Sequence, residues 1–329
     1  MTAPSSADTD DSPRSPPAED RRHPQGASLR RLFDEQWRQL LERWQAFRQG
    51  LDDGTRTTAR LAVESIVDDT DPRLRALNGY HRRLAASVRV LLEHVDGIIT
   101  AMPPALKVDP REFTTRPELR AFFATPADIK RLYEDDPQLQ AFLSAAAHPR
   151  LKEAFVLLSM RATFKSRFGP QLDSGRLLMD APLTLIDFSG HRLDLPSSSE
   201  ARLREALKKY LFDHYVAYVR RNMSANIRAE REKRAYRPAS PQSIENPEIY
   251  LQHLNRLLEA SRTLFRLEDR LLYVSRTGVL VHEDSEQPYD PLTLHEIGIE
   301  HEPRTVLVLT RYEHVPRSVP DPGEGESVA

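Results

Sequence analysis

Histidine and carboxylate residues gather in the C-terminal third of the sequence. Four of the eleven histidines lie between positions 282 and 314, and three of these are followed directly by glutamate. Imidazole nitrogen and carboxylate oxygen are ligands that zinc, manganese and iron accept. No histidine pair has i,i+4 spacing on an expected helix, and neighbours on a strand point to opposite faces. We therefore favour a solvated acidic face, with a metal site as the alternative. The candidate ligands are His282, His295, Glu296 and His301.

A second feature is a run of cations between positions 220 and 237. Seven basic residues stand there against Glu230 and Glu232, which gives the run a formal charge of +5. Such a helix end could bind the phosphates of nucleic acid or of anionic lipid, bind a protein partner, or simply be solvated. Tyr236 is the one aromatic residue in the run, so a protein partner is favoured over a polyanion. The basic residues are Arg220, Arg221, Arg228, Arg231, Lys233, Arg234 and Arg237.

Asp187, Ser189 and His191 have the residue types of a nucleophilic triad. Close neighbours on a strand rarely converge in that way. An expected hairpin also explains each of them, with Ser189 in the turn, Asp187 opposite Arg192 and His191 beside Phe188. The sequence has no GxxxxGK[ST], GxSxG or HExxH motif, and no GxGxxG between a strand and a helix. We therefore expect no catalytic residue and no cofactor.

The composition limits the class of protein. A length of 329 residues suits one large domain or two ordinary ones. Forty-seven basic and 49 acidic residues give a net charge of -2, so any polyanion site has to be local. The absence of cysteine excludes disulfide frameworks, thiol catalysis and thiolate metal sites. No apolar run approaches the ~18 residues of a membrane span, and the polar N-terminus has no signal peptide. We expect a cytoplasmic protein.

Helical periodicity dominates the N-terminal third. Residues 1–27 and 317–329 are polar and rich in proline, and are expected to be disordered tails. From position 28, apolar residues recur at intervals of 3 and 4, which is typical of a packed helix. A second long helix is expected at 71–102, with a short one near 57–67, and the three could bury one another. The apolar positions of the first helix are Phe33, Trp37, Leu40, Trp44, Phe47 and Leu51.

Proline follows a capping residue at several places. The side chain of such a residue accepts a hydrogen bond from a free amide, and proline fits the first position of a helix. This pattern predicts short helices at 117–123, 126–134 and 137–146. A longer helix at 149–168 is expected to be the central core helix, because it is apolar nearly all round. The capping residues are Asp71, Asp109, Thr125, Asp136, Asn246 and Asp290.

Strand patterns are fewer. Residues 183–195 are interpreted as a hairpin around a two-residue turn, Ser189–Gly190. A helix is expected at 199–236, then a linker at 238–246 and a second helix at 247–270. The remaining expected elements are strands near 271–276 and 279–283 around Thr277–Gly278, a short helix after Asp290–Pro291, and a central strand at 305–310.

The predicted fold is a mainly α protein, a helical bundle at 28–237 with a β-hairpin insertion near 183–195 and a small C-terminal α+β subdomain at 247–316. The basic end of the helix at 220–237 is expected to project. The predicted function is that of a non-enzymatic interaction or adaptor protein with an unknown protein partner. Contact with nucleic acid or an anionic membrane surface, and a homo-oligomer, stay open. The alternative is a metal-assisted hydrolase, in which the ion would lower the pKa of a bound water.

Overall fold

The computed structural model describes residues 54–145, 151–173, 176–234, 246–285, 287–300 and 302–313. The chain divides into two units, Met1–Thr58 and Ala59–Ala329. Almost all of the described residues belong to the second unit. The helix expected from position 28, both expected tails and nearly all of the expected linker lie outside the described residues.

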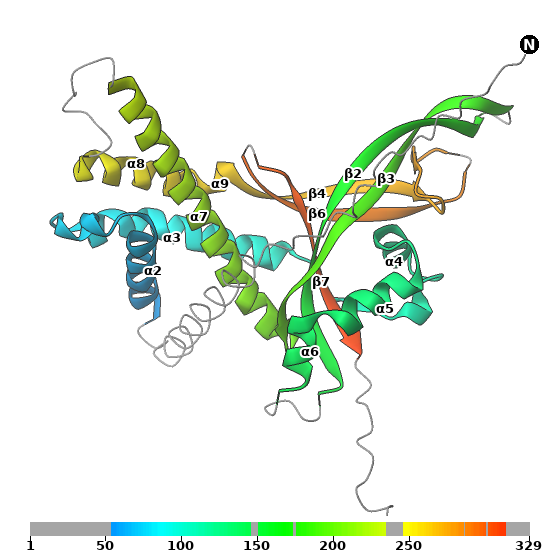
Figure 1. Ribbon diagram of the computed structural model, residues 1–329, viewed down its shortest axis with the longest axis horizontal. Coiled ribbons are helices and arrows are strands. Elements are labelled where there is room, and N and C mark those ends of the chain that lie inside the picture. Colours follow the sequence, from blue (N-terminus) through cyan, green and yellow to red (C-terminus); the bar gives the residue numbers. More distant parts are fainter. Residues whose placement is uncertain are drawn as a thin grey trace, which may run out of the picture. The chain divides into compact units, whose positions relative to one another are not determined.

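A seven-stranded sheet organises the second unit (Figure 1). The strand order is β3-β2-β7-β6-β4-β5, and β1 pairs in parallel with β7. The sheet curls so that its two end strands, β3 and β5, approach each other. There the N–H of Ile186 in β3 donates to the carbonyl oxygen of Gly278, just before β5, at 3.0 Å. The strands are β1 (Leu106–Val108), β2 (Glu153–Asp173), β3 (Arg176–Ser197), β4 (Phe265–Ser275), β5 (Leu280–Val281), β6 (Tyr289–Ile299) and β7 (Thr305–Glu313).

Helices pack against both faces of the sheet and form two separate apolar cores. The helical core contains α2 (Gly54–Thr70), α3 (Tyr80–Ala101), α7 (Glu200–Arg234), α8 (Pro247–Glu259) and α9 (Ser261–Leu264), with the short 3-10 helix η2 (Pro72–Ala76). The second core contains α4 (Pro117–Phe122), α5 (Pro126–Asp135) and α6 (Pro137–Leu143), preceded by η3 (Pro110–Glu112). In β2, Val156 and Leu158 enter the second core and Leu157 enters the helical core.

The prediction of a mainly α helical bundle is wrong. The described residues are 50% helical and 33% strand, and the strands join in one large curled sheet. The expected central helix at 149–168 is strand β2 instead. Its run from Ala154 to Leu158 is apolar on both faces, because helices cover both faces of the sheet there. An uninterrupted apolar run fits a buried strand and a buried helix equally well.

The expected hairpin turn at Ser189–Gly190 is also wrong. Strand β3 continues through it, and β2 turns into β3 between Asp173 and Arg176. The pairings Ser159↔Arg192 and Arg161↔Ser189 leave one residue of β2 opposite two of β3, which is a β-bulge. Gly190 has a φ of +67°, which suits both a tight turn and a bulge.

The C-terminal elements are confirmed in part. The turn at Thr277–Gly278 and the strand at 305–310 are present, as β4–β5 and β7. The helix expected at 247–270 ends at Glu259, and after α9 the chain continues as β4. Asp290 starts no helix, because Tyr289–Ile299 forms β6. These strands share one sheet with β2 and β3, so neither an inserted hairpin nor a separate small α+β subdomain describes the fold.

The capping pattern is confirmed at five of its six positions. Each of these side chains accepts a hydrogen bond from a backbone N–H within the first turn of the helix that follows, with proline at the helix start. The helices at 117–122, 126–135 and 137–143 begin as expected. The confirmed caps are Asp71, Asp109, Thr125, Asp136 and Asn246.

Two glycine substitutions should change stability in opposite directions. Gly190→Ala should lower the free energy of unfolding by about 1 kcal/mol, because alanine is strained at positive φ. Gly97→Ala should raise it by about 0.5–1 kcal/mol, because Gly97 lies inside α3 and a Cβ there meets nothing within 4 Å. Urea denaturation measures both. A stabilising Gly190→Ala would contradict the bulge.

Candidate binding pocket

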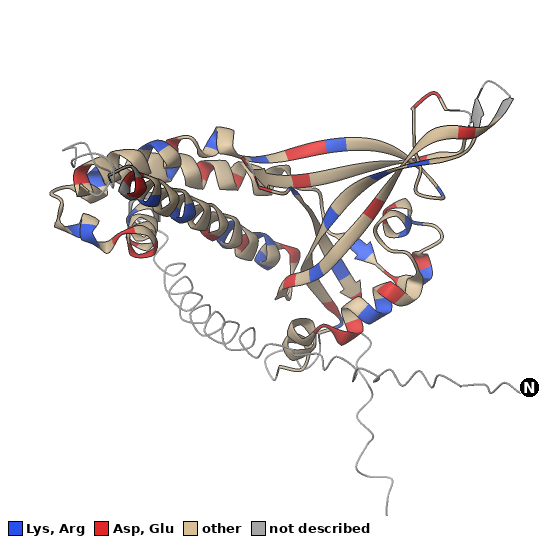
Figure 2. Ribbon diagram, turned by 45° about the horizontal axis from the view of Figure 1, so that its top comes forward, with Lys and Arg blue, Asp and Glu red and all other residues tan. Residues whose placement is uncertain are grey.

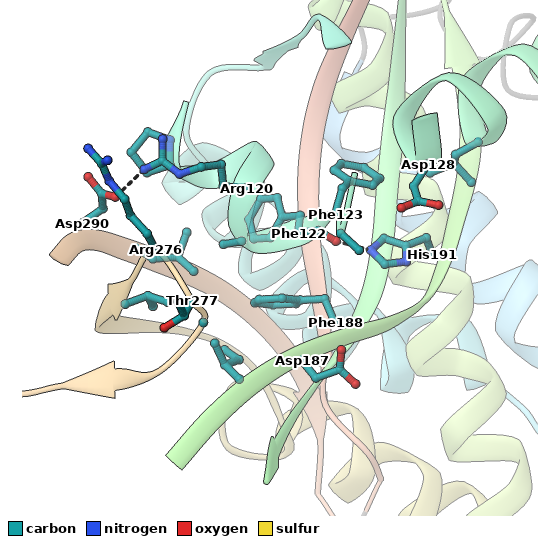
Figure 3. A pocket seen from close by; sticks show the side chains of 18 of the residues that line it. Arg120, Phe122, Phe123, Asp128, Asp187, Phe188, His191, Arg276, Thr277 and Asp290 are labelled. Atoms are coloured by element: carbon teal, nitrogen blue, oxygen red, sulfur yellow. Dashed lines mark hydrogen bonds and ion pairs between the residues drawn. The ribbon is translucent and has the colours of Figure 1, made fainter. Parts of the chain in front are cut away.

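A cavity of about 890 Å³ opens between α4–α5 and one end of the curled sheet (Figure 3). Its walls come from four separate parts of the chain. Helices α4 and α5 form one side, and β3 crosses another. The turn between β4 and β5 and the start of β6 complete it. The pocket therefore depends on the curl that brings Gly278 next to β3.

The floor of the pocket is apolar. Phe122 and Phe188 meet edge to face, with their ring centroids 5.1 Å apart and an interplanar angle of 79°. Both rings are buried in the second core, and Figure 3 shows Phe122 and Phe188 next to each other among the lining side chains. Ile186, Val274 and Leu292 extend this floor. Aromatic side chains in the lining are typical of a binding pocket for an apolar group.

The rim of the pocket is charged. Arg120 pairs with Asp290, and Arg131 pairs with Asp128. The lining contains five aspartates and three arginines, so the rim is acidic by two charges. A cationic or neutral occupant is therefore favoured over an anion. The remaining charged side chains of the lining are Asp135, Asp136, Asp187 and Arg276.

His191 joins the floor to α4. Its Nε2–H donates to the carbonyl oxygen of Phe122 at 2.7 Å. Its ring also stacks on Phe123, with centroids 5.1 Å apart. Asp187 pairs instead with Lys165 Nζ at 2.6 Å, not with Arg192 as expected. Ser189 lies within β3 and not in a hairpin turn, so the structural roles expected for Ser189 and Asp187 are both wrong, and within the described residues no hydrogen bond joins His191 to either of them.

Strand β3 has an edge without a partner strand among the described residues, beside the floor, where Phe188 is 8% exposed. The N–H of Ile186 points away from β2, toward Gly278. Backbone groups of every second residue on a strand face the same side, so the N–H and C=O of Phe188 also point away from β2. Thr163 Oγ1 donates to the Asp187 carbonyl oxygen at 3.1 Å, which agrees with Asp187 facing β2. Apart from the pairing of β3 with β2, the described residues make no backbone hydrogen bond to Phe188. This edge lies next to Thr277 and Gly278, which line the pocket.

The basic run does not contribute to the pocket. Arg220, Arg221 and Arg228 are exposed on α7, and Arg221 pairs with Glu302. Basic and acidic side chains are interspersed along this helix (Figure 2). The side chains of Arg231, Lys233 and Arg234, and all of Arg237, lie outside what the structure describes. A contact through this run therefore stays a prediction.

The candidate metal ligands are only partly described. His295 Nδ1 lies 2.7 Å from Asp269 Oδ1 across β4 and β6. Glu296 is buried and, as the next residue of β6, points to the opposite face. His282 follows β5, and His301 lies outside the described residues. Within the residues that are described, no three histidine or carboxylate side chains are placed to hold a metal ion.

Sequence reasoning missed this pocket. None of the candidate binding or metal residues lines it, although Asp187 and His191, interpreted as structural, do. The short helices and the Thr277–Gly278 turn were visible as local patterns. Their convergence depends on sheet pairing between distant segments, for which no local signal exists.

Comparison with family models, with curated proteins and with solved structures finds no match. No helix in the described part of the chain is both long and apolar enough to cross a membrane. Any functional conclusion therefore rests on the geometry of the site itself.

The pair between Arg120 and Asp290 should matter for stability, since it joins α4 to β6 across the pocket. Arg120→Met should lower the free energy of unfolding by about 1–2 kcal/mol, because a partly buried carboxylate loses its partner. Arg262→Met, in a pair with Glu93 that is exposed on both sides, is the matched control and should stay within about 0.5 kcal/mol. Urea denaturation compares the two. Equal effects would show that the pocket wall does not depend on this pair.

Proposed function

We propose that this chain is a non-enzymatic interaction protein of the cytoplasm that holds an extended segment of a protein partner in the pocket. The observation that carries this proposal is the free edge of β3 at Phe188, directly beside an apolar floor. Extended peptides bind such edges by adding a strand, and adjacent pockets select alternate side chains.

The structure already contains a short form of this interaction. The turn between β4 and β5 places Val279 opposite Leu185 as an isolated bridge, and Gly278 accepts the hydrogen bond from Ile186. A bound segment would continue along the same edge of β3, with its backbone bonding to Phe188. Its side chains would alternate between the floor and solvent.

The lining indicates the chemistry of the partner segment. An apolar side chain fits beside Phe122 and Phe188, and a lysine or arginine fits the acidic rim near Asp135. Nothing in this arrangement calls for a nucleophile or a metal. A metal-assisted hydrolase has less support, because Glu296 faces away from His295 and, within the described residues, no three histidine or carboxylate side chains gather.

A designed peptide tests the proposal. The probe is a fluorescent decapeptide that alternates lysine with valine and phenylalanine, and fluorescence anisotropy measures its Kd for the full chain. Its matched control carries N-methyl groups on alternate backbone amides, which removes the edge hydrogen bonds and keeps every side chain. We expect the control to bind at least about tenfold more weakly, since two or more hydrogen bonds are lost.

A substitution in the floor gives the second comparison. Phe188→Leu should weaken binding of the unmodified probe by about threefold to tenfold, because apolar contact with the floor is lost. Phe168→Leu, on exposed β2, is the control and should bind as the original chain does. Equal Kd values for the probe and its N-methylated form would overturn the strand-addition proposal. Binding that is insensitive to Phe188→Leu would place the peptide elsewhere.

A further inference from the structure

The outer part of the β2–β3 hairpin, residues 161–185, runs past the last pairing of β2 with β7 and is called the arm here. Strand β2 pairs with β7 as far as Met160 and has no β7 partner after that residue. Beyond it, β2 and β3 pair with each other down to Asp173 and Arg176. In Figure 1 the two strands run out together to the upper right. The arm therefore lacks the helical layers that cover the rest of β2.

Large apolar side chains are exposed on this arm. Phe168 is 79% exposed and Met179 is 65% exposed. Among the described residues, the arm holds four of the six large apolar side chains with high exposure, the other two being Leu61 and Leu271. Apolar side chains concentrated on one projecting element mark a contact surface. The remaining two on the arm are Phe164 and Leu178.

Cations occupy the same stretch of β2. Arg161, Lys165 and Arg167 alternate with Phe164 and Phe168, so the cations and the rings lie on opposite faces of the ribbon. All three cations are exposed. Lys165 pairs with Asp187, and the described structure shows no carboxylate partner for Arg161 or Arg167. The arm is thus amphipathic, with long cationic side chains on one face and aromatic side chains on the other.

The edges of the arm are poorly suited to pairing with another strand. Lys165 and Arg167 place charges along β2, and Pro170 lacks an N–H. In β3, Pro182 stands opposite Phe168 and lacks an N–H as well. Charges and prolines on an edge disfavour strand addition by a second chain. The aromatic face of the ribbon, not its edges, is therefore the binding surface.

We propose that the arm binds an anionic lipid surface. Phe168 and Met179 enter the boundary between headgroups and acyl chains, where an apolar side chain needs no shape-matched partner. Arg161, Lys165 and Arg167 reach lipid phosphates by extending their long side chains. This contact is separate from the peptide pocket, so an adaptor could hold a partner while it rests on a membrane. It does not depend on the proposed peptide function.

Co-sedimentation with vesicles tests the proposal. The probes are vesicles of phosphatidylcholine alone and vesicles with about one third phosphatidylglycerol, the anionic lipid. We expect the full chain to bind the anionic vesicles and not the neutral ones. Phe168→Ser should weaken that binding by about tenfold, because the most exposed ring no longer enters the lipid. Joint replacement of Arg161, Lys165 and Arg167 by Gln should weaken it by at least about tenfold.

Matched variants away from the arm serve as controls. Leu61→Ser removes an apolar side chain that is 49% exposed on α2, and should leave vesicle binding unchanged. The pair Arg220→Gln and Arg228→Gln removes exposed cations from α7 and should also leave it unchanged. Circular dichroism confirms that each variant is folded.

Three results would overturn the proposal. The first is failure of the original chain to bind anionic vesicles, and the second is loss of binding in the α7 variant with no loss in the arm variants. The third is a concentration-dependent dimer in analytical ultracentrifugation that Phe168→Ser abolishes, which would assign the arm to a second copy of the chain.

Discussion

The structure depends on the pairing between β2 and β7. Eight consecutive register positions, from Glu153↔Glu313 to Met160↔Val306, join the middle of the chain to its end. Because side chains alternate along each strand, this register sends Val156 and Leu158 to one core and Leu157 to the other. A shift of the β2–β7 register by one residue would exchange the side chains that enter the two cores. Both helical layers are therefore positioned by a single strand pair.

The pocket arises where this sheet curls back on itself. The bulge at Gly190 bends β3 while allowing it to continue, and the turn at Gly278 meets it at Ile186. Phe122 and Phe188 are buried at the margin of the second core, where they line the cavity that α4 and α5 border. His191 connects the two walls by bonding to the Phe122 carbonyl oxygen. A binding cavity thus forms from elements whose main role is to close a core.

The same two strands have different environments along their length. Up to Met160, β2 is covered on both faces, and beyond it the strand is exposed with Phe168 in solvent. Burial of the first part supplies the rigidity that an extended arm needs, because a two-stranded ribbon is only marginally stable alone. An adaptor with a peptide pocket and a lipid-binding arm would use one hairpin for both contacts.

Local chemistry determined those features that the sequence alone predicted. Asp136 caps α6, Thr277–Gly278 forms a turn, and β7 is a strand, because each depends on a few neighbouring residues. Only the tertiary structure decided that Ala154–Leu158 is a strand, since its apolar run suits a buried helix equally well. It likewise decided that Ser189–Gly190 is a bulge, because glycine at positive φ fits both a turn and a bulge and only the partner strand distinguishes them. The pocket belongs to this second class, because Phe122, Phe188 and Gly278 are brought together by pairings between distant segments of the chain.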